Sequence, residues 1–414
     1  MNKEMKKVPT VRFKGFTDDW EQRKLGDVAT FSKGAGYSKS DLQESGTPII
    51  LYGRLYTDYE PVISDVDTFV EANSGSVYSK GGEVIVPASG ETAEDISIAS
   101  VVEKSGVLLG GDLNIIQPNE KISSVFLALS VSNGEPHNDM ARRAQGKSVV
   151  HLHNSDLAQI KLRYPSSSEQ EKISTYFLNL DNFITLHQRK LDQLQTLKKY
   201  FLQNMFPTKG EKVPAIRFKG FTGDWEQRKL DDVVASFEYG LNAAAKDYDG
   251  KNKYLRITDI DDSTHEFLKE NLTSPDTDIS ETGNYKLQEG DVLFARTGAS
   301  VGKTYIYKES DGLVFYAGFL IRAKIKKDYN PEFIFQNTLT PNYDKYIRIT
   351  SQRSGQPGVN AREYGEYTLM VPSLLEQRKI GKCLRNLDNL ITLHQRKCDQ
   401  LQSLKKFMLQ NLFI

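Results

Sequence analysis

The stretch "EQEKISTYFLNLDNFITLHQRKLDQLQTLKKYFLQNMF", residues 169–206, decides the fold because the chain contains it twice. It returns at residues 376–413 as "EQRKIGKCLRNLDNLITLHQRKCDQLQSLKKFMLQNLF", with 26 of 38 positions identical. In both copies apolar side chains recur in steps of four and three, which is the heptad pattern of a helix that packs along another helix. Each copy therefore predicts one helix about 55 Å long, at a rise of about 1.5 Å per residue.

The apolar seam of each helix follows from this pattern. In the first helix it comprises Ile173, Phe177, Leu180, Ile184, Leu191 and Leu194, and in the second Ile380, Leu384, Leu387, Ile391, Cys398 and Leu401. Further leucines widen the stripe, so we expect each helix to have neighbours beyond its seam partner. These are Leu186, Leu197 and Leu202 in the first helix and Leu393, Leu404 and Leu409 in the second.

Polar residues occupy two seam positions in each helix. His187 and His394 fall at equivalent positions, and we expect them to be partly buried and to hydrogen-bond across the pair rather than to act in catalysis. Lys198 and Lys405 fill the other position. Their stems are expected to lie along the seam while their ammonium groups stay in water.

A second repeated stretch precedes the helices. "VPTVRFKGFTDDWEQRKLGDV" at residues 8–28 returns as "VPAIRFKGFTGDWEQRKLDDV" at residues 213–233, with 17 of 21 positions identical. The chain is therefore two copies of one plan, each a globular part followed by a long helix. The predicted fold is mixed α+β, with an internal pseudo-twofold repeat. Its segments are a first α/β domain at 1–165, a first spacer helix at 166–206, a second α/β domain at 207–372 and a second spacer helix at 373–414.

The two helices are expected to be antiparallel. The second globular part begins at the end of the first helix and runs straight into the start of the second. A compact domain of that size has a radius of gyration of about 15 Å, so it fits most easily beside both of those helix ends at once. An antiparallel pair separates the globular domains, with one at each end.

The stretch "GASVGKT", Gly298–Thr304, fails the spacing of a phosphate-binding loop. Such a loop reads G-x-x-x-x-G-K-[ST], whereas only three residues separate Gly298 from Gly302. The sequence "TYIYKES" alternates like a strand instead of opening a helix. We therefore interpret the stretch as a backbone turn of the domain, with Arg296 and Lys303 as candidates for contact with a ligand backbone.

Composition limits where the protein acts. No apolar run approaches the ~18 residues of a membrane helix. The two cysteines, Cys383 and Cys398, lie 15 residues apart on one predicted helix and cannot bridge each other. These features predict a cytoplasmic protein with reduced thiols.

Charge is balanced overall but uneven along the chain. The 54 basic and 54 acidic residues argue against indiscriminate coating of nucleic acid. Residues 1–165 carry 18 basic against 22 acidic side chains, and residues 207–372 carry 23 against 25. Any nucleic-acid surface must therefore be a local patch.

The sequence carries no complete catalytic motif. "TPNY", Thr340–Tyr343, is the nearest approach to the [NDS]-P-P-[YF] tetrapeptide of an adenine methyltransferase, and it lacks the second proline. The Pro275–Asp276 pair has no following [DE]-x-Lys of a Mg-dependent nuclease, and no His/Cys cluster has metal-ligand spacing. The sequence thus favours a binding protein without a metal over an enzyme of unknown motif.

Two acid-free basic stretches, residues 141–155 and 345–362, precede the helices at the same distance. Arginine can pair with guanine and glutamine or asparagine with adenine, while lysine holds phosphate. This mixture favours DNA groove reading over a solvated loop. The DNA-binding candidates are Arg142, Arg143, Lys147, His151, His153, Lys345, Arg348, Gln352, Arg353, Gln356, Asn360 and Arg362, together with Arg296 and Lys303.

Only traces of the two globular parts align between the repeats. "GEVIVPASG", Gly82–Gly90, falls opposite "GDVLFARTG", Gly290–Gly298. "GKSVVHLHN", Gly146–Asn154, falls opposite "GQPGVNARE", Gly355–Glu363. A shared frame with unlike contents suggests two modules that do the same kind of work on different objects.

Together these features resemble the specificity (S) subunit of a type I DNA restriction-modification enzyme along the whole chain. The residues that carry the resemblance are "WEQRKL" at Trp20 and Trp225, the runs "GEVIVPASGETAEDI" and "GDVLFARTGASVGKT", and the paired "LHQRKLDQLQ" and "LHQRKCDQLQ" helices. The resemblance implies two target-recognition domains, each reading one half of a split, asymmetric DNA sequence. It implies that the helices fix the unread gap and dock two methyltransferase (M) subunits, to which restriction (R) subunits bind. S-adenosylmethionine, ATP and Mg would then belong to those partners.

A different class of protein stays open as an alternative. A coiled-coil scaffold with two protein-binding domains and no DNA contact explains the helices. It gives no reason for the two basic stretches.

If the helix pair sets the spacing of the half-sites, its length can be changed without changing what is read. Inserting four residues between Leu186 and Leu197 is expected to lengthen the unread gap, because the domains must meet the same face of the duplex about one turn apart. Methylome sequencing measures the gap and both half-sites together. Altered half-sites at a constant gap would contradict this prediction.

Overall fold

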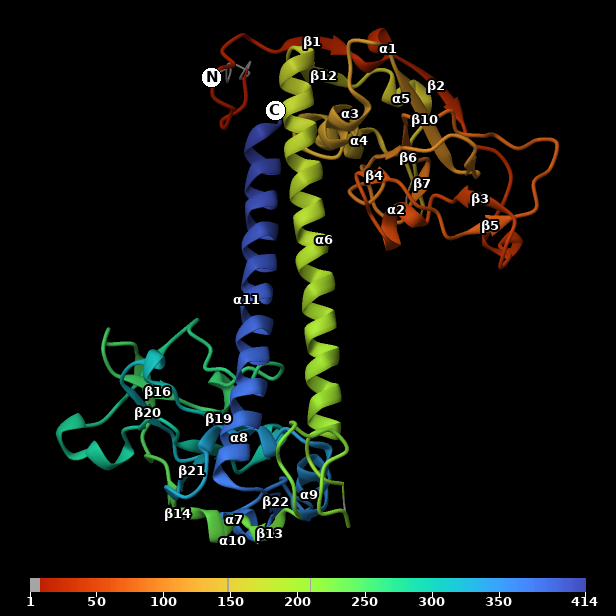
Figure 1. Cartoon of the computed structure of the whole chain (residues 1–414). Coiled ribbons are helices and arrows are strands. Elements are labelled where there is room, and N and C mark those ends of the chain that lie inside the picture. The colour runs from red at the N-terminus through yellow and green to blue at the C-terminus, as the bar shows by residue number, and fades with distance from the viewer. Residues whose placement is uncertain (1–7, 147–148, 209) are drawn as a thin grey trace. The chain divides into compact units, whose positions relative to one another are not determined.

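The computed structural model describes residues 8–146, 149–208 and 210–414. These residues form two compact units: the described residues up to Leu186 together with Cys398–Ile414, and His187–Lys397. Each unit holds one α/β domain and part of both long helices, whose course can be followed in Figure 1. The units divide the helices because residues from both helices contribute to the core of each unit.

The two long helices are α6, Ser167–Asn204, and α11, Leu374–Leu412. In the first unit, the rings of Phe177 and Phe413 lie 5.9 Å apart, and Asp181 pairs with Lys405 at 2.5 Å. From Phe177 to Asp181 the residue number rises along α6, while the number of the partner on α11 falls from 413 to 405. The predicted antiparallel arrangement is confirmed within this unit.

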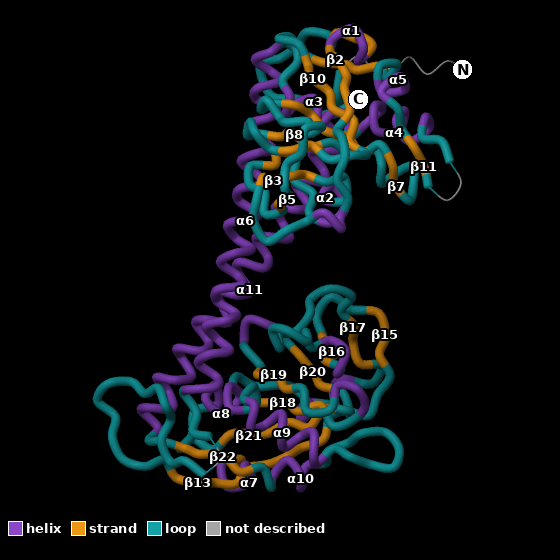
Figure 2. Tube along the Cα trace, turned by 90° about the vertical axis from the view of Figure 1, so that its right-hand side faces the viewer, coloured by secondary structure: helices purple, strands orange, loops and turns teal. Residues whose placement is uncertain are grey.

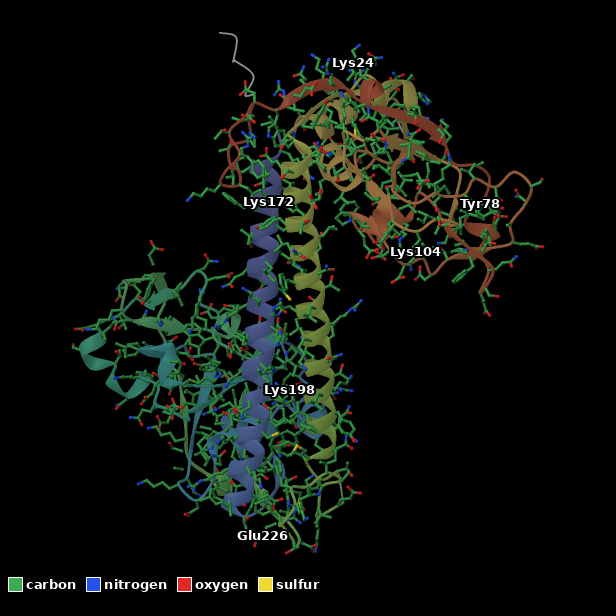
Figure 3. All side chains as sticks on the ribbon, turned by 45° about the horizontal axis from the view of Figure 1, so that its top comes forward. Lys24, Tyr78, Lys104, Lys172, Lys198 and Glu226 are labelled. Atoms are coloured by element: carbon green, nitrogen blue, oxygen red, sulfur yellow. The ribbon has the colours of Figure 1, made fainter. Side chains whose placement is uncertain are left out.

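The second unit repeats the antiparallel pairing. The Nδ1 atoms of His187 and His394 lie 2.9 Å apart, which confirms the predicted hydrogen bond across the pair. Lys198, labelled in Figure 3, pairs with Asp388 at 2.5 Å, and its side chain is 11% exposed. The sequence did not predict these ion pairs, in which Lys198 and Lys405 each find a carboxylate on the facing helix.

The predicted seam residues face both the partner helix and the domain cores. Ile184 and Leu401 are half-buried, and the others are buried: Ile173, Phe177, Leu180, Leu191, Leu194, Ile380, Leu384, Leu387, Ile391 and Cys398. Among the leucines that widen the stripe, Leu202 and Leu409 pack against the cores. The expectation that each helix has neighbours beyond its seam partner is confirmed, since both helices pack on a domain core. The other four leucines are exposed: Leu186, Leu197, Leu393 and Leu404.

The first domain is built on a five-stranded sheet of order β2-β10-β6-β8-β4, flanked by the smaller sheets β5-β3-β9, β1-β12 and β7-β11. Its strands are β1 Glu21–Lys24, β2 Ala29–Lys33, β3 Thr47–Ile50, β4 Val62–Ile63, β5 Phe69–Val70, β6 Glu83–Pro87, β7 Ser89–Gly90, β8 Ser100–Val102, β9 Leu108–Leu109, β10 Leu113–Pro118, β11 Val150–His151 and β12 Lys161–Tyr164. Its helices are α1 Leu25–Val28, α2 Arg54–Thr57, α3 Ser124–Val131, α4 Gly134–Arg143 and α5 Asn154–Leu157.

The second domain has a four-stranded sheet of order β14-β21-β18-β19 and the pairs β13-β22, β15-β17 and β16-β20. Its strands are β13 Glu226–Lys229, β14 Val234–Tyr239, β15 Ala245–Asp247, β16 Lys253–Leu255, β17 Thr273–Pro275, β18 Val292–Ala295, β19 Thr304–Ile306, β20 Val314–Tyr316, β21 Leu320–Ile325 and β22 Thr368–Val371. Its helices are α7 Leu230–Val233, α8 Pro331–Asn337, α9 Pro341–Thr350 and α10 Ala361–Gly365. Figure 2 shows the strands of both domains among long loops, and the mixed α+β prediction is confirmed.

The predicted turn at "GASVGKT" is also confirmed. Gly298–Ser300 form a single 3-10 turn, and strand β19 follows it in place of a helix. Both Gly298 and Gly302 have positive φ, and Gly302 packs against Ile347 so closely that a Cβ there would lie 2.5 Å from that side chain. The glycines therefore serve the backbone turn.

A salt bridge fastens each domain to the start of the helix that follows it. Arg12 makes two bonds of 2.7 Å to Glu169, and Arg217 makes bonds of 2.7 and 2.8 Å to Glu376. Both glutamates are 1% exposed. A buried carboxylate is costly without a partner, so this bidentate geometry fixes the position of the "RFKGF" turn on the helix.

The glutamine that follows each of these glutamates adds a second fixed point. Gln170 accepts from the Ser123 amide at 2.9 Å and donates to the Pro165 carbonyl at 2.9 Å. Gln377 accepts from the Asn330 amide at 2.9 Å and donates to the Pro372 carbonyl at 2.8 Å. The repeated "EQ.KI" motif is thus a joint between domain and helix, which explains why both copies retain it.

The same repeated turn also contacts the end of a long helix. The Val11 amide donates to the Asn411 carbonyl at 3.0 Å, and the Ile216 amide donates to the Asn204 carbonyl at 2.8 Å. Lys172, labelled in Figure 3, lies 5.8 Å from the ring of Phe13 on this turn.

None of the helices formed by the described residues is long and apolar enough to cross a membrane.

Breaking one joint should loosen one unit only. Glu376→Ala removes an acceptor of charge-assisted bonds worth about 1.5–3 kcal/mol, so the amide of Ile216 is expected to exchange hydrogen about 10- to 150-fold faster. The amide of Val11, in the other unit, serves as the internal control. Glu169→Ala should give the mirror-image result, and equal acceleration at both amides in either variant would refute a local joint.

Candidate nucleic-acid interface

The loop that carries the second basic stretch is tied across the end of β18. The Arg296 amide donates to the Phe319 carbonyl at 3.0 Å, and the Arg296 carbonyl accepts from the Val359 amide at 2.9 Å. Thr297 and Gly358 form an antiparallel bridge beside these bonds. The backbone at Arg296 therefore links three segments that are distant in the sequence.

The first domain contains the same backbone frame. The Ala88 amide donates to the Asp112 carbonyl at 2.7 Å, and the Ala88 carbonyl accepts from the Leu152 amide at 3.0 Å. Strands β7 and β11 pair next to these bonds, as Figure 2 shows. Ala88 and Asp112 thus occupy the frame positions that Arg296 and Phe319 hold in the second domain.

This frame corrects the sequence alignment of the two loops by two residues. The sequence placed Leu152 opposite Ala361, whereas the hydrogen bonds place Leu152 opposite Val359. In the same register His153 and Asn360 are the N-cap residues of α5 and α10. The sequence alignment relied on two shared glycines, and the loops that follow those glycines differ in length by two residues.

Arg296 is the best-placed candidate in the second domain. Its guanidinium lies 5.2 Å from the ring centre of Tyr239 and 5.8 Å from that of Phe319. These rings are 45% and 55% exposed. Nε of Arg296 is buried without a partner, and no described residue accepts a hydrogen bond from the terminal nitrogens. Contact with two aromatic rings restricts the orientation of a planar cation while its donors stay free.

Two amide side chains lie beside this arginine. The Nε2 atom of Gln356 is 3.0 Å from the position that a Cβ would take at Gly298. The side chain of Asn360 caps α10 by accepting from the Glu363 amide at 3.0 Å. Gln356 is exposed and makes no hydrogen bond to a described residue, so its amide is available to a ligand, whereas the oxygen of Asn360 is already engaged.

The remaining candidates of this loop differ in their freedom. Arg353 pairs with Glu363 and donates to the Thr350 carbonyl at 2.7 Å, so it braces the loop against α10. Gln352 and Arg362 are exposed.

The structure places Lys303 and Arg348 away from Arg296, in the lining of a cavity of about 830 Å³ beside the long helices. The ammonium of Lys303 pairs with Asp262 and donates to the Ile260 carbonyl at 3.0 Å, and its side chain is only 12% exposed. Lys345 is exposed on α9. Among Lys303, Arg348 and Lys345, the side chain of Lys303 is therefore the one already engaged by other residues of the domain.

Two titratable groups near these residues have shifted pKa values. Burial acts to raise the pKa of Glu238, but hydrogen bonds led by that from Arg322 outweigh it and lower the pKa to about 2. Glu238 is thus ionised next to Tyr239 and neutralises Arg322, which is 2% exposed. Burial lowers the pKa of His265 in the cavity, and the charges of Lys198 and Lys303 act in the same direction, so this imidazole is neutral at pH 7.

The candidates of the first domain gather around β11. Arg142 and Arg143 lie in the last turn of α4, where both pair with Asp139, at 3.6 and 3.2 Å. His151 and His153 are exposed on and after β11. Lys147 lies outside the described residues.

The sequence missed the two aromatic residues that hold Arg296. Tyr239 ends β14 and Phe319 precedes β21, so neither lies in the basic stretch that drew attention. The available signal was an aromatic residue directly beside a glycine, as in "YG" at Tyr239 and "GF" at Phe319. That signal is weak, because only the fold brings the two rings to one arginine.

Comparison with known families assigns the chain. Residues 17–196 and 222–403 each match the family described as the type I restriction modification DNA specificity domain. The chain belongs to this family and carries two copies of its domain. The predicted family membership is therefore confirmed. The function of this family is DNA recognition in type I restriction-modification systems.

Individual relatives agree along the chain. The MjaVIII type I restriction enzyme specificity subunit of Methanocaldococcus jannaschii is 21% identical over 410 residues, covering 94% of this chain and 91% of the relative. The EcoKI specificity subunit of Escherichia coli K12 is 22% identical over 324 residues, covering 71% of this chain and 68% of the relative. The crystal structure of a type I S subunit from M. genitalium superposes with a TM-score of 0.62 at 14% identity, over 98% of this chain and 99% of that one, so the fold is shared.

The position of Arg353 in the second domain leads to a specific expectation. Arg353→Ala removes the brace between the loop and α10, so it should weaken or relax recognition of only the half-site read by the second domain. Binding of the complex to duplexes mutated in one half at a time measures this effect. Equal losses at both halves would contradict it.

Proposed function

We propose that this chain is the DNA-binding specificity subunit of a type I restriction-modification complex and reads a bipartite, asymmetric target. Each domain would read one half through the loop that crosses the end of its central strand. The helix pair would hold the two readers at a set spacing. The chain itself would carry out no catalysis.

One observation carries this proposal. The two domains share a hydrogen-bonded frame, yet the side chains mounted on it are unlike: Arg296 and Phe319 in one domain stand where Ala88 and Asp112 stand in the other. Two copies of one catalytic site would carry the same chemistry. Readers of two different sequences require the opposite, a constant backbone with different donors and acceptors.

The exposed faces of the helices support docking of partner subunits. Four large apolar side chains are exposed on each helix at equivalent positions of the repeat: Phe183, Leu186, Leu197 and Tyr200 on α6, and Leu390, Leu393, Leu404 and Phe407 on α11. Exposed apolar groups of this kind mark interaction surfaces. Because the set occurs twice, it suits two copies of one partner, which we propose to be the methyltransferase subunits, with restriction subunits joining through them.

The cofactors of the reaction would then reside on those partners. We propose that S-adenosylmethionine is bound by the methyltransferase subunits and that ATP and Mg are bound by the restriction subunits, in the cytoplasm where the DNA lies. This proposal follows from the family and from the absence of the corresponding motifs in the sequence.

The test is a selection of bound duplexes from random DNA by this chain in complex with its methyltransferase partner. Two unlike half-sites separated by a constant gap are expected, and the partner without this chain, as the control, should select no such site. A complex that assembles but selects no sequence would favour the scaffold alternative.

A further inference from the structure

We propose that Arg296 is the residue by which the second domain recognises a guanine in its half-site, with Tyr239 and Phe319 as the residues that position it. This inference rests on the proposed function. It adds which DNA base is recognised and which residue recognises it. The three residues come from separate places in the chain: the end of β14, the residue after β18 and the residue before β21.

The geometry of Arg296 fits a base reader better than a structural arginine. The buried Arg322 of the same domain is neutralised by Glu238 and donates to the Lys286 carbonyl at 2.9 Å. Arg296 has no such acceptor among the described residues, although its Nε is buried. A guanidinium that is held by rings alone and keeps its terminal donors in solvent is poised for an acceptor that is absent from the protein.

The exposed rings account for the precision that base reading requires. The guanidinium carbon lies over both rings, 5.2 Å from the centre of Tyr239 and 5.8 Å from that of Phe319, and no described residue accepts from its terminal nitrogens. The hydroxyl of Tyr239 also accepts from the Ala361 amide at 3.3 Å, which ties this ring to the first turn of α10. The arginine is therefore preorganised, and little side-chain freedom is lost when it binds.

Guanine is the base that matches this edge. In the major groove it presents two adjacent acceptors, N7 and O6, to which arginine donates bidentately, and no other base offers that pair. A contact to phosphate would need no clamp, because phosphate contacts position the protein without reading sequence. The clamp of rings thus distinguishes Arg296 from an exposed cation such as Lys345 on α9.

The first domain provides an internal comparison. At the frame positions of Arg296 and Phe319 it has Ala88 and Asp112, and the residue that pairs with β10 at the position of Tyr239 is Lys33. These three residues cannot form a cation in contact with two rings. The contact that we assign to Arg296 therefore has no counterpart at the same frame position of the first domain.

The experiment measures the base preference of the whole complex with its methyltransferase partner, by selection from random duplexes. Arg296→Ala should reduce the preference for guanine at one position of the second half-site by about 5- to 150-fold and leave the first half-site unchanged. Arg296→Gln should move the preference at that position toward adenine, whose N6 and N7 match an amide. A change of preferred base cannot come from a loss of folding.

The controls separate this inference from the proposed function. Lys327→Ala, at an exposed lysine of the second domain outside the basic stretch, should leave every base preference unchanged. A wild-type complex that selects a bipartite site, combined with Arg296 variants that keep every preference or lose affinity uniformly, would overturn the role of Arg296 and leave the proposed function standing. A wild-type complex that selects no bipartite site would instead refute the proposed function.

Discussion

The buried ion pairs Arg12–Glu169 and Arg217–Glu376 are the constraint on which the rest of the structure depends. Each glutamate is 1% exposed, and such a carboxylate is stable only with its arginine in place. The pair holds the turn before a domain against the helix after it. The side chains that differ between the two domains are therefore carried on the same joint between domain and helix in both copies.

This support separates two kinds of sequence change. Residues of the joint and of the helix faces are repeated, because each forms the same contact twice. The side chains on the frame at Ala88 and Arg296 differ, although their backbone hydrogen bonds are the same. A protein that keeps its frame and varies what the frame presents can recognise a new partner without a new fold, which agrees with the function of the family.

The sequence predicted the elements whose pattern is local. The heptad steps, the antiparallel direction and the turn at Gly298 followed from periodicity, domain size and loop spacing. It also predicted the His187–His394 contact, because both histidines fall in the apolar seam. It missed the ion pairs of Lys198 and Lys405 and the rings around Arg296. Carboxylates on the facing helix and aromatic residues far along the chain leave no periodic signal, because their partners are fixed only when the elements pack.

The sequence by itself determined that the chain is a duplicated domain and helix of one family, because the repeats are long and their apolar spacing permits few other structures. The tertiary structure alone decided which basic residues are available. Lys303 and Arg353 are engaged by Asp262 and Glu363, whereas Arg296 contacts two rings and keeps its donors free. The physical reason is that the sequence identifies the basic side chains but not their partners. Whether a carboxylate or carbonyl engages a given side chain depends on which residues the fold brings within about 3 Å of it.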